Sequence, residues 1–166
     1  MVIDLKKIFV NDNSSLPLEY SLDMSDLEYM GYYPLKKPVV LKGTVSNKAS
    51  LVRLEASISY EYDAPCDRCG SEALREHSVK LDKSLAVRTE SEESDTILVI
   101  PDMKLDLEEL IYSEVVVNLP MKHLCKEDCK GICSKCGKNL NEGECGCPKK
   151  EIDPRLSVLA ALLNEE

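Results

Sequence analysis

The sequence predicts an α+β fold, in which a mainly antiparallel sheet or partly open barrel with packed helices is followed by a cysteine-rich module. Two observations lead to this prediction. Apolar and polar residues alternate over residues 52–62 with six successive matches to a period of two, which is typical of a half-buried strand. Six of the eight cysteines lie between residues 121 and 150, where large apolar residues are few and folding needs bound ligands.

Turn residues and the spacing of apolar residues predict the other elements. Asn47 and Lys48 are expected to form the turn between two strands. Cys66 and Cys69 fall between two alternating segments, which places them at the turn of a long antiparallel hairpin. The expected order is a short helix around residues 5–9, strands over 16–24, 39–45, 52–62, 74–87 and 96–100, and a helix over 107–118.

Two helices have clear start signals. Asp106 and Glu109 resemble a capping box ahead of the helix over 107–118. Asp153 and Pro154 are an N-cap and a first-turn proline for a short amphipathic helix at the end of the chain. We therefore expect two parts: residues 1–120 as a mainly antiparallel α+β domain, and residues 121–166 as a Cys-rich module with a C-terminal helix.

Composition narrows the class of protein. Apolar residues make up 43% and charged residues 31% of the 166, which is ordinary globular material. The apolar runs are far shorter than the roughly 20 residues that span a membrane, so we expect no membrane partner. Charged residues at the N-terminus stand where a secretory signal needs apolar ones, which favours a cytoplasmic protein. The net charge of −9 excludes a uniformly basic surface for nucleic acid.

Cysteines are the most informative residues of this chain. In a reducing compartment, eight cysteines indicate metal ions rather than disulfides. The pattern Cys-x-x-Cys-Gly occurs twice, starting at Cys66 and at Cys133. Its spacing lets both thiolates bind one tetrahedral ion, and the glycine permits a positive φ. We expect two zinc ions, ligated by Cys66, Cys69, Cys125 and Cys129 and by Cys133, Cys136, Cys145 and Cys147, and hence a C-terminal zinc-binding module.

The pairing of the first four cysteines rests on elimination. A helical turn would place Cys125 and Cys129 on one side of the chain, but Cys129 could also serve the second site. His123 is a possible substitute ligand, although a surface position is the simpler expectation. Closed sites of four thiolates are usually structural.

Charge is unevenly distributed along the chain. Residues 121–151 carry seven lysines and five acidic residues, a net charge of +2, while the other residues sum to −11. The acidic part favours a basic protein partner, and the lysines of the cysteine-rich part favour RNA. We find no Ser-His-Asp set, phosphate loop or recognisable carboxylate pair, so we expect neither catalytic residues nor a small-molecule substrate.

Three segments carry a resemblance to a known family. Pro65-Cys66-Asp67-Arg68-Cys69 follows a tyrosine-rich strand, Leu119-Pro120 ends a helix, and a Cys-rich segment runs from Cys125 to Asn141. Together with Asp153-Pro154-Arg155-Leu156 they resemble the Cys-rich bacterial branch of the YceD family, the large ribosomal RNA subunit accumulation proteins.

The resemblance implies a role in accumulation or processing of large-subunit ribosomal RNA. We therefore expect a non-enzymatic ribosome-biogenesis factor whose partner is a ribosomal protein, ribosomal RNA or an RNA-processing enzyme. One alternative is a redox-switched zinc chaperone, in which oxidation releases zinc and exposes apolar surface. Another is an RNA-processing enzyme, against which stands the lack of an open metal site with a carboxylate or histidine ligand.

Overall fold

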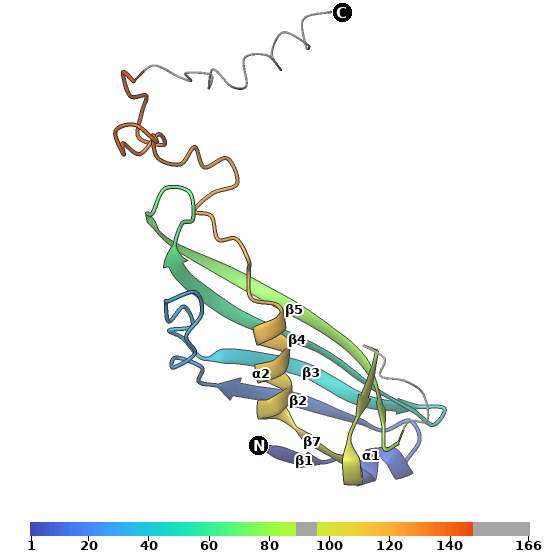
Figure 1. Cartoon of the computed structure of the whole chain (residues 1–166). Helices are drawn as coiled ribbons and strands as arrows, with labels where there is room; N and C mark the ends of the chain where they lie inside the picture. Colours follow the sequence, from blue (N-terminus) through green and yellow to red (C-terminus); the bar gives the residue numbers. More distant parts are fainter. Residues whose placement is uncertain (89–95, 148–166) are drawn as a thin grey trace, which may run out of the picture.

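The structure is a computed structural model that describes residues 1–88 and 96–147. Its largest part is a curled sheet with the strand order β2-β3-β4-β5-β6, and α2 lies across one face of that sheet (Figure 1). A second, small sheet pairs β1 with β7. The elements are β1 (Val2–Asp4), α1 (Lys6–Val10), β2 (Ser15–Leu22), β3 (Val39–Lys48), β4 (Leu51–Pro65), β5 (Glu72–Ala86), β6 (Ile97–Val99), the 3-10 helix η1 (Pro101–Met103), β7 (Lys104–Asp106) and α2 (Leu107–Val117).

The strands from β2 to β5 form an antiparallel meander, as the alternating pattern predicts. β4 and β5 are the longest strands, and their pairing ends at Pro65 opposite Glu72, which leaves Cys66 and Cys69 in the hairpin turn. The last strand differs from its neighbours, because β6 pairs with the end of β5 in parallel. The sheet is therefore mainly, but not wholly, antiparallel.

The turn between β3 and β4 does not lie where the sequence predicts it. Ala49 and Ser50 form it, with φ of 53° and 64°, a pair of positive values that matches the twist of a two-residue hairpin. Asn47 belongs instead to β3 and is only 2% exposed. The prediction of a turn at Asn47 and Lys48 is wrong because asparagine here serves as a buried hydrogen-bonding residue rather than a turn residue.

The hydrophobic core lies between α2 and the facing side of the sheet. Along β4, every second residue from Val52 to Ala64 is buried, so the predicted half-buried strand is confirmed. α2 contributes one buried face to the same core, and its start is capped by Asp106, whose side chain accepts a hydrogen bond from the backbone N–H of Glu108 at 3.0 Å. The buried residues of α2 are Leu107, Leu110, Ile111 and Val115.

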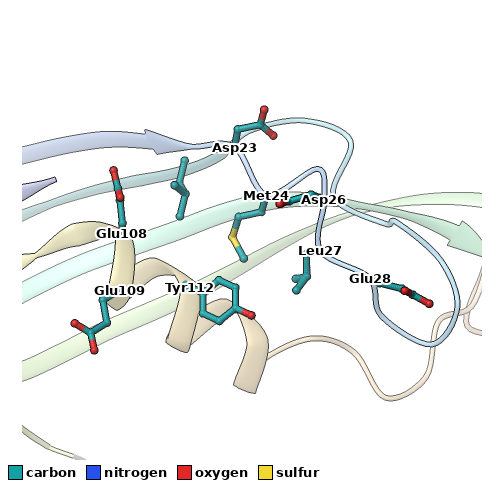
Figure 2. Close-up of a pocket in the computed structure, with 9 residues that line it drawn as sticks. Asp23, Met24, Asp26, Leu27, Glu28, Glu108, Glu109 and Tyr112 are labelled. Atoms are coloured by element: carbon teal, nitrogen blue, oxygen red, sulfur yellow. The ribbon is translucent and has the colours of Figure 1, made fainter.

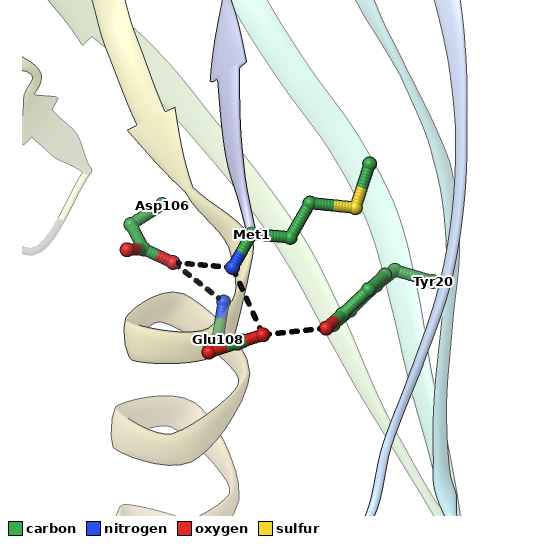
Figure 3. A network of polar contacts seen from close by, with 4 residues as sticks. All are labelled: Met1, Tyr20, Asp106 and Glu108. Atoms are coloured by element: carbon green, nitrogen blue, oxygen red, sulfur yellow. Dashed lines mark hydrogen bonds and ion pairs between the residues drawn. The ribbon is translucent and has the colours of Figure 1, made fainter.

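Polar contacts tie the start of α2 to β1 and β2 (Figure 3). The amino group of Met1 lies 2.9 Å from Glu108 Oε1, and the Tyr20 hydroxyl donates to the same oxygen at 2.6 Å. The short sheet of β1 and β7, which the sequence analysis did not predict, holds Met1 in this position. Among the described residues, no helix has both the length and the apolar character needed to cross a bilayer. The predicted helix from Asp153 lies outside the described residues.

Candidate metal centres

The eight cysteines gather into two groups of four in the structure. Within each group, the four Sγ atoms lie within 4.8 Å of one another. We call them the hairpin cluster (Cys66, Cys69, Cys125 and Cys129) and the tail cluster (Cys133, Cys136, Cys145 and Cys147). The hairpin cluster joins residues that are far apart in the sequence, whereas the tail cluster is local.

The spacing of the sulfur atoms suits a metal ion. In the hairpin cluster, Cys66 Sγ lies 3.8 Å from Cys129 Sγ, and Cys69 Sγ lies 3.6 Å from Cys125 Sγ. Four thiolates bound tetrahedrally at about 2.3 Å from one ion are about 3.8 Å apart. All eight cysteines are free of disulfides. Both groups could therefore hold a metal ion without a large change in geometry.

The two Cys-x-x-Cys-Gly segments have the same backbone structure. The N–H of Gly70 donates to the carbonyl of Cys66, and the N–H of Gly137 donates to the carbonyl of Cys133, both at 2.8 Å. In each segment the N–H of the first cysteine also donates to the carbonyl five residues later, again at 2.8 Å. Both glycines have positive φ, 69° and 73°, so the glycine in the motif permits the turn that brings the two sulfurs together.

Two arginines support the segment that supplies the other half of the hairpin cluster. Arg68 donates from Nη1 to the carbonyl of Cys129 at 2.8 Å, and Arg75 on β5 donates from Nη2 to the carbonyl of Cys125 at 2.5 Å. Their guanidinium groups thus satisfy backbone oxygens in a segment without regular secondary structure. Arg68 is part of the motif that carries the family resemblance, but the role of neither arginine follows from the sequence, because the contacts they make are long-range and leave no local pattern.

His123 and Asp67 form a further set of hydrogen bonds beside the hairpin cluster. Two hydrogen bonds join these residues: the N–H of Asp67 donates to the carbonyl of His123 at 2.9 Å, and the N–H of His123 donates to the side-chain Oδ2 of Asp67 at 2.6 Å. The ring Nε2 of His123 lies 2.8 Å from the carbonyl of Ala73. His123 is only 4% exposed, so the expectation of a surface histidine is wrong.

The segment that carries the tail cluster contacts the hairpin cluster through Asn141. Asn141 donates from Nδ2 to the sulfur of Cys129 at 3.3 Å and accepts from the N–H of Lys130 at 2.9 Å. The backbone N–H of Ile132 donates to the carbonyl of Arg68 at 3.1 Å. Cys125 and Cys129 do not form the expected helical turn. The N–H of Cys129 donates to the carbonyl of Lys126 at 3.1 Å in a turn over residues 126–129, and Cys125 precedes that turn.

The surroundings of the sulfurs favour thiolates at particular positions. Burial opposes ionisation of Cys66, but backbone N–H groups of Cys125, Arg68 and Cys69 outweigh it and lower its pKa to about 6. Backbone N–H groups of Cys136 and Lys135 lower the pKa of Cys133 to about 6. By contrast, burial and the neighbouring sulfurs raise the pKa of Cys125 to about 12. Thiolates this close repel one another unless a cation lies between them.

The fold and these sites define a sheet-rich protein with two four-cysteine clusters, one at a hairpin tip and one in the tail. Residues 54–163 match the family model described as Large ribosomal RNA subunit accumulation protein YceD. The chain belongs to the YceD family, and the resemblance seen in the sequence is confirmed. The matched range contains all eight cysteines.

Several curated proteins are similar to this chain. An uncharacterized protein of Mycobacterium tuberculosis is 33% identical over 105 residues, which are 61% of this chain and 50% of the relative. The Arabidopsis thaliana protein named Large ribosomal RNA subunit accumulation protein YCED homolog 1, chloroplastic, is 25% identical and covers 90% of this chain and 54% of its own length.

A Bacillus subtilis relative, the uncharacterized protein YlbN, is 27% identical over 78% of this chain and 76% of its own length. This chain thus spans about half the length of the mycobacterial and Arabidopsis relatives. No solved structure matches it.

Proposed function

We propose that this protein is a non-enzymatic ribosome-biogenesis factor that supports the accumulation of large-subunit ribosomal RNA in the cytoplasm. The observation that carries the proposal is the family match over residues 54–163. The Arabidopsis relative, which is similar over 90% of this chain, supports it because its name states that role. The partner would be a ribosomal protein, ribosomal RNA or an RNA-processing enzyme.

In this proposal each cluster holds one zinc ion. The donor set consists of thiolates alone, and the sulfur separations of 3.6 and 3.8 Å in the hairpin cluster fit the tetrahedral geometry that zinc adopts. Four protein ligands leave no open position for substrate or water, which favours a structural role. The ion would replace the core that the segment after α2 lacks, because metal-binding energy is folding energy in such segments.

The proposal keeps the two-part division of the chain at residue 120. The first part would form the sheet and α2, and residues 121–166 would form the zinc module. Through Cys66 and Cys69 the hairpin tip of the first part would provide half of one zinc site. The module would therefore be held in a defined place on the sheet rather than on a free linker.

Depletion of the protein in its own host would test the proposed function. We expect the ratio of large- to small-subunit ribosomal RNA to fall, and the full wild-type chain to restore it. A Cys66→Ser and Cys133→Ser double variant, expressed at the same level, should restore it less well. An unchanged RNA ratio after complete depletion would contradict the proposal.

A second candidate, the redox-switched zinc chaperone, is favoured by the exposure of Cys136 in the tail cluster. An exposed ligand is accessible to oxidants, whose attack on a thiolate releases the metal. Treatment with a small excess of peroxide should then release zinc and allow the protein to suppress aggregation of an unfolded client. Retention of zinc under this treatment would exclude the switch.

A further inference from the structure

A hollow of about 480 Å³ lies between α2 and the loop that follows β2 (Figure 2). It shares no residue with the cysteine clusters, because its lining comes from the end of β2, the loop after it and the first half of α2. Its lining residues are Leu22, Asp23, Met24, Asp26, Leu27, Glu28, Glu108, Glu109 and Tyr112. These residues divide into an apolar floor and an acidic rim.

Apolar side chains form the floor of the hollow. Met24 is 3% exposed and belongs to the hydrophobic core, and the half-buried Leu22 and Leu27 pack against that core. Tyr112 on α2 stands at the side of the hollow and is 52% exposed, so about half of its surface is open to a partner. The same loop continues into further exposed apolar residues, namely Met30, Tyr32 and Tyr33. Exposed apolar surface of this kind is typical of an interaction site.

Five carboxylates surround this floor, and among the residues that the structure describes no lysine, arginine or histidine lines the hollow. Asp26, Glu28 and Glu109 are exposed, and within the described part of the chain their side chains form no ion pair or hydrogen bond. Glu108 contacts Met1 and Tyr20, and hydrogen bonds, first of all from Tyr20, lower the pKa of Glu108. Within the described part of the chain, the rim therefore gathers five carboxylates around one amino group, that of Met1.

Several acidic residues of the sheet and of α2 lie in ion pairs. Each of five carboxylates lies within 4.0 Å of a lysine or arginine, in the pairs Glu19–Lys42, Glu61–Lys37, Asp63–Lys36, Asp82–Arg53 and Glu114–Lys83. At the rim of the hollow, the amino group of Met1, which contacts Glu108, is the one cationic contact within the described part of the chain. The like charges repel one another, and a cationic partner would relieve that repulsion.

We propose that this hollow binds a lysine- and arginine-rich segment of a protein partner, with one apolar side chain of the segment seated on Met24 and Leu27. The proposal rests on the proposed function, for which it names the class of partner and the surface that meets it. Complementary charge would bring the segment to the rim, and burial of its apolar side chain would hold it there. Phosphate groups of RNA would be repelled by the same carboxylates.

Direct binding of a synthetic peptide tests this inference. The probe is a short fluorescent peptide of lysine and arginine around one leucine, titrated with the full zinc-loaded chain at low salt. The variant carries Asp26→Asn, Glu28→Gln and Glu109→Gln, which remove the unpaired carboxylates while keeping side-chain size. The matched control carries Glu55→Gln, Glu72→Gln and Glu127→Gln, which change three exposed acids outside the hollow and alter the net charge equally.

We expect the rim variant to weaken peptide binding by about tenfold and the control variant by less than about twofold, since each exposed ion pair contributes modestly. A peptide with glycine in place of leucine should bind the wild type more weakly. Equal weakening by the two variants, or no effect of the leucine, would overturn the inference in favour of unspecific attraction to an acidic protein. Binding of an RNA oligonucleotide that the rim variant weakens would overturn it too.

The test separates this inference from the proposed function. If the wild type supports ribosomal RNA accumulation but does not bind the peptide, the hollow is not a docking site and the proposed function stands. If depletion leaves ribosomal RNA unchanged while the peptide binds at the rim, the hollow is a docking site and the proposed function fails.

Discussion

Asn47 shows how a single buried amide links two elements. Its Nδ2 donates to the carbonyl of Ile8 at 2.8 Å, and so joins β3 to the end of α1. With 2% exposure, the site offers no water to replace the side chain. After Asn47→Ala the carbonyl of Ile8 would therefore lose its short buried hydrogen bond and keep only the longer one, of 3.4 Å, from the Ser14 hydroxyl.

We predict that Asn47→Ala lowers the free energy of unfolding by about 1–3 kcal/mol. Asn11→Ala is the matched control: its Nδ2 also donates to a carbonyl of α1, that of Lys7 at 2.9 Å, but in an exposed position where water takes its place. Urea unfolding followed by circular dichroism measures both. Equal losses in the two variants would contradict a special role for the buried amide.

The environment of His77 predicts a pH dependence of stability. Its ring stacks on Tyr60 with a centroid distance of 5.5 Å, and its Nε2 is buried with no hydrogen-bond partner among the described residues. Burial, followed by electrostatic interaction with His123 and Arg75, lowers the pKa of His77 below the ordinary 6.5. The unfolded chain thus binds a proton at a higher pH than the folded protein does.

We predict that the free energy of unfolding decreases as the pH falls from 6.5 through the lowered pKa of His77 in the folded protein. Above pH 6.5, where His77 is neutral in both states, it should cause no such loss. His77→Phe keeps the ring stacking and removes the titration. Unfolding free energies of zinc-loaded wild type and variant, measured over the same pH range, should diverge below about pH 6.5. Parallel curves would show that His77 titrates alike in both states.

At the scale of elements, the close approach of β3 and β4 depends on Gly43. This residue lies opposite Ala56 in the register of the two strands. A Cβ at position 43 would lie 2.4 Å from the Cβ of Ala56 and 2.5 Å from the carbonyl oxygen of Glu55. Because backbone atoms are among the contacts, a side-chain rotation cannot relieve the clash, and the strands would have to move apart.

We predict that Gly43→Ala costs about 1–3 kcal/mol of stability, despite the better strand propensity of alanine. The neighbouring, exposed Lys42→Ala should cost less than about 1 kcal/mol, since it removes only a surface ion pair with Glu19. Thermal unfolding of both variants checks this difference. A Gly43→Ala protein as stable as the wild type would show that the sheet adjusts without strain.

For the whole molecule, the two clusters differ in what they connect. The hairpin cluster links the turn between β4 and β5 to the segment after α2, whereas the tail cluster closes a loop within residues 133–147. In the proposed two-part chain, loss of zinc from the hairpin cluster should therefore loosen more of the structure than loss of zinc from the tail cluster.

We predict that Cys136→Ser removes one zinc ion and loosens only residues around 133–147, while the sheet stays intact. Cys69→Ser should loosen the hairpin tip and the whole described segment after Pro120. Zinc content and amide hydrogen exchange, measured by mass spectrometry on both variants, distinguish the two results. Equal, global unfolding of both variants would contradict the two-part division.

Local sequence patterns were enough to predict the central hairpin, α2 and the repeated Cys-x-x-Cys-Gly turns. Each of these depends on residues close together in the chain: the period-two alternation of β4, the cap at Asp106, and a glycine that permits positive φ after two cysteines. The composition likewise indicated metal sites, because so many cysteines lie in a segment too poor in large apolar residues to fold by burial.

Tertiary structure alone decided which distant residues meet. The burial of His123, the arginine contacts to the backbone of Cys125 and Cys129, and the hollow under Tyr112 each join segments that no local pattern connects. Asn47 illustrates the reason: its intrinsic preference for turns was outweighed by a buried carbonyl of α1 that needed a donor. Side-chain propensities describe a residue with its neighbours in sequence, and these features arise from neighbours in space.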